Sequence, residues 1–201
     1  MWLSVMTRPD IANALRACSR HSHDPSPRHW KALLQVASYV IETKEIGLRF
    51  VRGSGLRLSV YVDADYTAAS NDRRSVSDVT VVLVNTAISW KSSTQKCVVT
   101  VMCEAEYVAL CDAAKEAIFE TAVLVFLQPQ LAGMCVAIFG DNEGAMAIIA
   151  NNPSRASRSK HIDVKFHFIQ GPVRAGEIRI LHVGTKVQHA DILTRALWRK
   201  K

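Results

Sequence analysis

The sequence has few of the residues that interrupt regular structure. It contains 9 glycines and 6 prolines among 201 residues, and 49% of its residues are hydrophobic. A chain of this length and apolar content can bury one sizeable core. No apolar run approaches the roughly 18 to 20 residues that cross a bilayer, and the six residues that open the chain are too short for a signal peptide. We therefore expect a folded intracellular protein with no membrane contact, in the cytoplasm or the nucleus.

Cysteine is scarce and is not arranged for zinc or for disulfides. The five cysteines are odd in number and show neither Cys-x-x-Cys nor the Cys/His spacing of zinc sites. They are Cys18, Cys97, Cys103, Cys111 and Cys135. Free cysteine usually behaves as a small buried apolar residue. We expect buried free thiols.

Acidic residues are fewer than basic ones. The chain has 18 Asp and Glu against 25 Lys and Arg, which gives a formal net charge of +7 and a pI of about 9.3. An excess of positive charge favours a polyanionic partner, because binding releases counterions. Charge alone does not identify a nucleic-acid-binding protein, since many basic proteins bind none.

The hydrophobic period changes near residue 53. Before it, Pro9 and Pro27 each precede a stretch with helical spacing, and residues 20–28 read as the loop between them. After it, apolar residues alternate in 58–62, which is typical of a strand. We therefore predict a helical unit at 1–52 and a second unit at 55–201.

The second unit begins with strands and continues with alternating helices and strands. Strands are expected at 58–63, 79–84 and 87–99, a long helix at 103–127, a strand at 135–139, helices at 143–150 and 160–175, a strand at 177–183 and a helix from about 190. Strands joined by short loops and then by helices predict an α/β fold with a mixed sheet and right-handed crossovers.

Two aspartates stand where strands are expected to end. Asp63 closes the first strand, and Asp141 follows the apolar strand at 135–139. Ligands collect at the carboxyl ends of strands in α/β sheets. Both residues also have ordinary interpretations, because Asp often begins a turn and often caps the next helix.

Glu106 lies on the apolar side of the long helix. At about 100° per residue it falls in line with Leu110, Ala113 and Ala117, whereas Glu104 falls on the opposite side. A carboxylate buried among apolar residues costs several kcal/mol unless a cation meets it. The alternative is a partly exposed glutamate in the first turn, where the helix dipole favours negative charge.

Seven short strings complete the pattern. They are YVDADY at 61–66, DRRSVS at 72–77, AISWKS at 87–92, EAEYVAL at 104–110, GDNEGA at 140–145, SKHID at 159–163 and ADILT at 190–194. In this order, over about 140 residues, they resemble the ribonuclease H domain of copia-type retrotransposon polyproteins. TRPDIA at 7–12 and HWK at 29–31 resemble the stretch that follows the polymerase in the same polyproteins.

The resemblance implies a fold, an activity and a site. The fold is the ribonuclease H-like five-stranded mixed sheet with flanking helices, preceded by the helical tail of a reverse transcriptase at 1–52. The activity is hydrolysis of the RNA strand of an RNA/DNA hybrid with two Mg²⁺ ions, or Mn²⁺ in their place. The metal ligands carried over by position are Asp63, Glu106, Asp141 and Asp191. The partners are the hybrid and the remainder of a reverse transcriptase polyprotein.

Other features leave alternatives open. The basic cluster Arg155, Arg158, Lys160 and His161 would hold phosphates of the hybrid or form an ordinary solvated loop. Nothing in the spacing assigns a role to His182 or to His189.

The chain also departs from the family pattern. Asp78 and Val79 stand where Gly-Tyr is usual, and we expect Gly171-Pro172 to interrupt the helix that starts near Lys160. Such changes keep open a decayed or domesticated element that binds nucleic acid or a partner without cutting. A DNA-cutting transposase or resolvase of the same fold superclass would also use clustered acids.

Overall fold

A computed structural model describes residues 2–53, 55–66, 74–96, 98–99, 102–151, 168–184, 188–190 and 193. Its elements before the sheet are α1 (Trp2–Met6), η1 (Pro9–Ile11), α2 (Ala12–Ser19) and α3 (Pro27–Glu42). The prolines stand at the first helical positions of η1 and α3, where the missing N–H costs nothing. At the start of α3, the Nδ1 of His29 accepts a hydrogen bond of 3.1 Å from the backbone N–H of Ser26.

The sheet has five strands. They are β1 (Leu58–Asp65), β2 (Val76–Leu83), β3 (Thr86–Thr94), β4 (Val136–Gly140) and β5 (Ile178–His182), in the order β3-β2-β1-β4-β5. β1, β2 and β3 are antiparallel, and β4 and β5 run parallel to β1. The predicted ribonuclease H-like mixed sheet is confirmed. β3 ends earlier than expected, at Thr94 rather than near residue 99.

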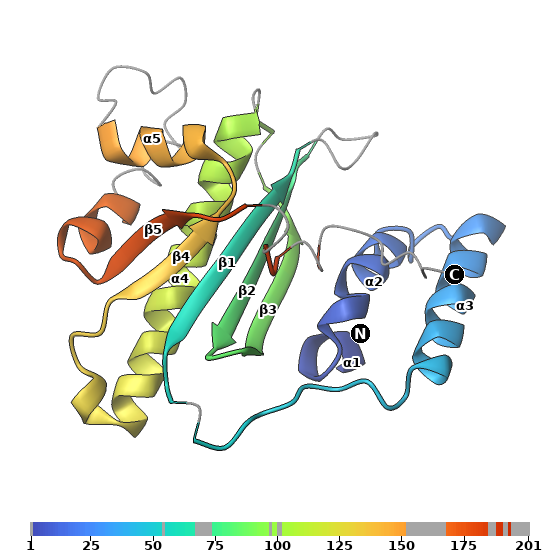
Figure 1. Ribbon diagram of the computed structural model, residues 1–201. Helices are drawn as coiled ribbons and strands as arrows, with labels where there is room; N and C mark the ends of the chain where they lie inside the picture. Colours follow the sequence, from blue (N-terminus) through green and yellow to red (C-terminus); the bar gives the residue numbers. More distant parts are fainter. Residues whose placement is uncertain are drawn as a thin grey trace.

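The helix α4 (Met102–Leu127) packs against β1, β2 and β4 and forms the core with them. Figure 1 shows α4 lying along one face of the sheet. Val60 and Val62 of β1 are fully buried in this cluster, as is Ala109 of α4. The first half of α4 is enclosed on most sides, so Cys111 is also fully buried, although the helical wheel places it away from the apolar stripe.

The N-terminal helices lie beside β3 (Figure 1). α2 contacts β3, the indole Nε1 of Trp90 donates a hydrogen bond of 2.5 Å to the carbonyl of Ser4, and the hydroxyl of Thr86 donates one of 2.5 Å to the carbonyl of Arg49. The division into units at 1–52 and 55–201 stays a prediction. These contacts show that the first unit is attached to the sheet of the second.

The crossover helices include α5 (Glu143–Asn151), η2 (Pro129–Leu131) and a helix at 168–174. Gly171 and Pro172 lie inside the last of these, so the expected interruption at this point is wrong. Helical bonding continues past the proline, since the N–H of Ala175 donates to the carbonyl of Gly171 at 3.0 Å. Proline costs a helix one hydrogen bond and some crowding, but its φ angle is helical.

Two further expectations meet the structure here. Among the described cysteines Cys111 alone is buried, Cys18 and Cys103 are half-buried and Cys135 is exposed, so the expectation of buried thiols holds only at Cys111. Within the described part of the chain, no helix is both long enough and apolar enough to cross a membrane.

Candidate metal centre

Three acidic side chains come together from three elements. Asp63 lies near the end of β1, Asp141 directly follows β4, and Glu106 lies in the first turns of α4. β1 and β4 are parallel neighbours, so the residues at their carboxyl ends meet at one edge of the sheet. α4 begins at this edge. The convergence therefore follows from the strand order together with the placement of α4.

One carboxylate oxygen from each of Asp63, Glu106 and Asp141 lies within 4.8 Å of the other two. Glu106 is 2% exposed, and the other two are partly exposed. Oxygen ligands converging from several chain segments are what Mg²⁺ and Mn²⁺ bind. The structure thus brings together three of the four acids that the sequence predicted.

The electrostatics of Glu106 support a cation at this place. Burial, together with the nearby negative charges of Asp63 and Asp141, raises its pKa to about 8, against the opposing effect of the Ala64 backbone N–H. In the described part of the chain, Oε1 of Glu106 has no hydrogen-bond partner. A buried carboxylate with an open oxygen and two acidic neighbours fits a divalent cation.

The alternative role of Asp141 as a helix cap is excluded by its neighbour. Oδ1 of Asn142 accepts a hydrogen bond of 3.0 Å from the backbone N–H of Ala145 in the first turn of α5. Asn142 therefore caps α5. Asp141 is left to take part in the acidic cluster.

The alternative for Glu106 is excluded as well. Glu106 is buried, as its position on the apolar stripe predicted, whereas Glu104 is half-buried.

The continuation of β1 to Asp65 places Asp63 and Asp65 on the same face of the strand. Asp65 is exposed and does not join the cluster.

The remaining predicted site residues lie outside the described residues. This holds for the fourth predicted ligand, Asp191, and for Arg155, Arg158, Lys160 and His161 of the basic cluster. Ala190 and Leu193, the nearest described residues on either side of Asp191, are fully buried.

Sequence reasoning missed one buried acid close to the site. Asp78 of β2 is 0% exposed and lies directly opposite Asp63 in the antiparallel register. Burial raises its pKa to about 7, while the Ser92 hydroxyl and the Arg16 guanidinium of α2 oppose this shift. The signal for it was the departure at this position, where the family usually has glycine.

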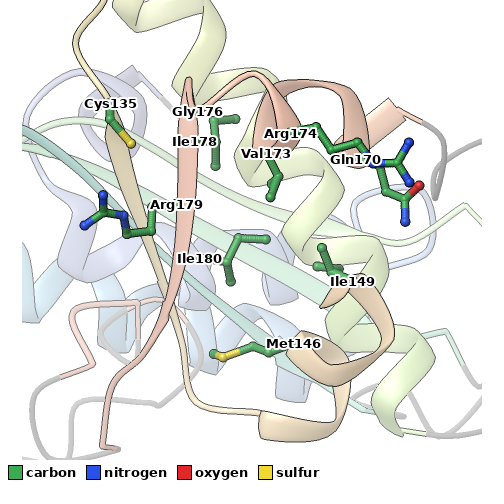
Figure 2. A pocket seen from close by; sticks show the side chains of 10 residues that line it. All are labelled: Cys135, Met146, Ile149, Gln170, Val173, Arg174, Gly176, Ile178, Arg179 and Ile180. Atoms are coloured by element: carbon green, nitrogen blue, oxygen red, sulfur yellow. The ribbon is translucent and has the colours of Figure 1, made fainter. Parts of the chain in front are cut away.

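The largest of the described cavities lies elsewhere. It measures about 530 Å³ and is lined by residues of β5, α5 and the helix at 168–174. Figure 2 shows Ile149, Val173 and Ile180 around its interior, with the Arg179 guanidinium pointing to the other side of β5. None of the clustered acids lines it.

Comparison with known proteins identifies the family. The chain is 38% identical over 195 residues to the retrovirus-related Pol polyprotein from transposon RE2 of Arabidopsis thaliana, which covers 97% of this chain. The chain belongs to the Pol polyproteins of copia-type retrotransposons. It spans 13% of the length of the RE2 polyprotein. The resemblance seen in the seven sequence strings is therefore confirmed.

Two further similarities complete the comparison. The chain is 40% identical over 121 residues to secreted RxLR effector protein 161 of Plasmopara viticola, covering 60% of this chain and 85% of that protein. Among solved structures, LC11-RNase H1 in complex with an RNA/DNA hybrid aligns with a TM-score of 0.45 and 19% identity, over 68% of this chain and 93% of that one. No family model matches the chain.

Proposed function

We propose that this Pol segment is a metal-dependent ribonuclease H that hydrolyses the RNA strand of RNA/DNA hybrids. The observation that carries the proposal is the convergence of Asp63, Glu106 and Asp141 within 4.8 Å at the carboxyl edge of a ribonuclease H-like sheet. Membership in the copia-type Pol polyproteins supports it. We further propose that Asp191 completes the ligand set and that the segment works as part of a longer reverse transcriptase polyprotein.

The residues of the chain would bind and orient the ions and the scissile phosphate. Two Mg²⁺ ions, when bound, supply the activation of water and the stabilisation of the leaving oxygen in phosphodiester hydrolysis. Asp63 and Asp141, both partly open to solvent, would hold ions on the substrate side of the cluster. Glu106 lies at its buried side and would hold an ion there in its ionised form, although its pKa of about 8 favours the protonated form at neutral pH when no cation is bound.

Recognition of the hybrid would use shape and charge. The net charge of +7 favours a polyanion, and the 2′-hydroxyl of ribose distinguishes the RNA strand from DNA. The basic cluster at 155–161 is our proposed contact with the phosphates. We expect little sequence preference, and we expect binding to weaken steeply as salt rises.

Four end-labelled substrates test the proposal. These are an RNA/DNA hybrid, double-stranded RNA, double-stranded DNA and single-stranded RNA, each with Mg²⁺, Mn²⁺ or Ca²⁺. We expect cleavage of the hybrid alone, with 5′-phosphate and 3′-hydroxyl ends, in Mg²⁺ or Mn²⁺. Ca²⁺ should permit binding without turnover, because its looser coordination misplaces the reacting oxygens. Equal cutting of single-stranded RNA, or 2′,3′-cyclic phosphate products, would contradict the proposal.

A second candidate is a domesticated segment that binds nucleic acid or a partner without cutting. The observation that favours it is the 40% identity to an effector protein, of which this chain covers 85%. The same substrate panel separates the two. A binding protein would retain the hybrid in EDTA as tightly as in Mg²⁺ and would yield no product at any protein concentration.

A further inference from the structure

Gln188 is a buried side chain that bridges two segments near the carboxylate cluster. It is 5% exposed, and its Nε2 donates a hydrogen bond of 2.8 Å to the carbonyl of Val62. Its Oε1 accepts a hydrogen bond of 3.4 Å from the backbone N–H of Ala190. Val62 directly precedes Asp63 in the chain, and Ala190 directly precedes Asp191. One amide therefore bridges the residues before two of the predicted ligands.

Gln95 makes a similar contact with the third element of the site. It is 4% exposed, and its Nε2 donates hydrogen bonds of 2.8 Å to the carbonyl of Ala105 and to the hydroxyl of Ser77. Ala105 directly precedes Glu106. The backbone of Gln95 is attached too, since its N–H donates to the carbonyl of Ser75 at 2.8 Å.

The two glutamines share one geometry. Each is buried, and each donates from Nε2 to the carbonyl of the residue immediately before a clustered acid. The carbonyl of one residue belongs to the same rigid peptide plane as the N–H and Cα of the next. Holding that carbonyl therefore limits the rotation of the plane and so the direction in which the following carboxylate leaves the backbone.

Clustered acids need such support. One carboxylate oxygen from each of Asp63, Glu106 and Asp141 lies within 4.8 Å of the other two, so these side chains repel one another when they are ionised together. Repulsion favours backbone adjustments that move the carboxylates apart, and hydrogen bonds from buried amides resist them because breaking one leaves a buried polar group unpaired.

We propose that Gln95 and Gln188 are positioning residues of the carboxylate site, which hold Glu106 and Asp63 at the spacing that a divalent cation requires. The proposal rests on the proposed function, in which these acids are metal ligands. Groups that orient metal ligands typically contribute 10- to 100-fold to metal affinity or activity. We expect an effect of this size from either glutamine.

The experiment compares three variants of the full chain. Gln95→Met and Gln188→Met keep the length of the side chain and remove its hydrogen bonds. Thr86→Val is the matched control, because it also removes a side-chain hydrogen bond to a backbone carbonyl, that of Arg49. Thr86 begins β3, whereas Gln95 follows the last residue of this strand. Mn²⁺ affinity is measured by calorimetry without nucleic acid, and thermal unfolding is measured on the same samples.

We expect both methionine variants to fold and to bind Mn²⁺ about tenfold or more weakly. Thr86→Val should lose stability but bind Mn²⁺ as the wild type does. On hybrid, kcat should fall for the glutamine variants while KM stays unchanged, and higher Mn²⁺ should restore part of the rate. If a methionine variant does not fold, the asparagine variant at that position, which keeps an amide on a shorter side chain, takes its place with the same expectation.

Mn²⁺ affinity within twofold of wild type in the folded glutamine variants would overturn the inference. The inference would also be overturned if Thr86→Val lost Mn²⁺ affinity as the glutamine variants do, each in proportion to its loss of thermal stability.

The two proposals fail separately. A wild-type chain that binds Mn²⁺ but cuts no hybrid refutes the nuclease while the variant series still tests positioning. A chain that cuts hybrid with unaffected variants refutes positioning alone.

Discussion

Asp78 lies directly opposite Asp63 across the antiparallel pair of β1 and β2, and it is fully buried where Asp63 is partly exposed. In the neighbouring antiparallel pair of β2 and β3, Ser92 of β3 lies directly opposite Asp78. Arg16 of α2 is half-buried nearby, and its positive charge acts on Asp78. A fourth acid, Asp78, thus lies beside the three of the carboxylate cluster, and α2 provides its cationic neighbour.

The first prediction concerns Asp78→Asn and pH. The pKa of Asp78 is raised from 3.8 to about 7 by burial, so between these values the folded chain holds more protons than the unfolded chain. Stability from this group is therefore lost as pH rises from about 4 to about 7. The variant should be more stable than wild type at pH 8, by up to about 4 kcal/mol, with the difference vanishing near pH 4. Urea unfolding of the variant and the wild type at pH 4 and pH 8 measures this difference in stability. A variant that is less stable than the wild type by the same amount at both pH values would contradict the prediction.

The second prediction concerns Asp141→Asn. Removing one acid from the cluster relieves repulsion, which we expect to stabilise the fold by about 1 to 3 kcal/mol, and removes a metal ligand, which should reduce cleavage to background. The cap of α5 is kept, because Asn142 supplies it. Thermal melting and the hybrid assay on the same preparation decide, and near-normal activity would sink the assignment of this residue.

The third prediction separates two glutamates on one helix. Glu106→Gln should abolish cleavage and weaken Mn²⁺ binding, because the buried ligand oxygen loses its charge. Glu104→Gln is the matched control and should keep activity within about twofold, since Glu104 lies outside the cluster. Equal loss in both variants would mean that the activity depends on the start of α4 and not on the carboxylate of Glu106.

The fourth prediction concerns deletion of residues 1–52. All three clustered acids lie in the second unit, so turnover on a long hybrid should persist. The deletion removes the acceptors of the Trp90 and Thr86 hydrogen bonds and uncovers part of β3, so we expect a lower melting temperature and lower solubility. Activity assays and melting curves of the truncated chain measure both. A truncation that is soluble and folded but inactive would refute the division into units.

The sequence alone was enough for most of the described elements, for Glu106 by its position on the helix, and for Asp63 and Asp141 through the resemblance. Alternation in 58–62 and helical spacing in 103–127 are local patterns, and each is set by which side of an element must be buried. The same reasoning selected Glu106 over Glu104, because a single helix determines which of its residues face inward. The seven strings then indicated the family, which the similarity to the RE2 polyprotein confirms.

Other features depended on the tertiary structure. Neither the burial of Asp78 nor the capping of α5 by Asn142 rather than Asp141 follows from local spacing. Gln188 reaches Val62 across 126 positions of the chain, and Gln95 meets Ala105 only because α4 is folded back onto the sheet. The physical reason is that periodicity reports which side of an element is apolar. The partner of a buried polar group is decided by which strands become neighbours, and only the assembled sheet determines that.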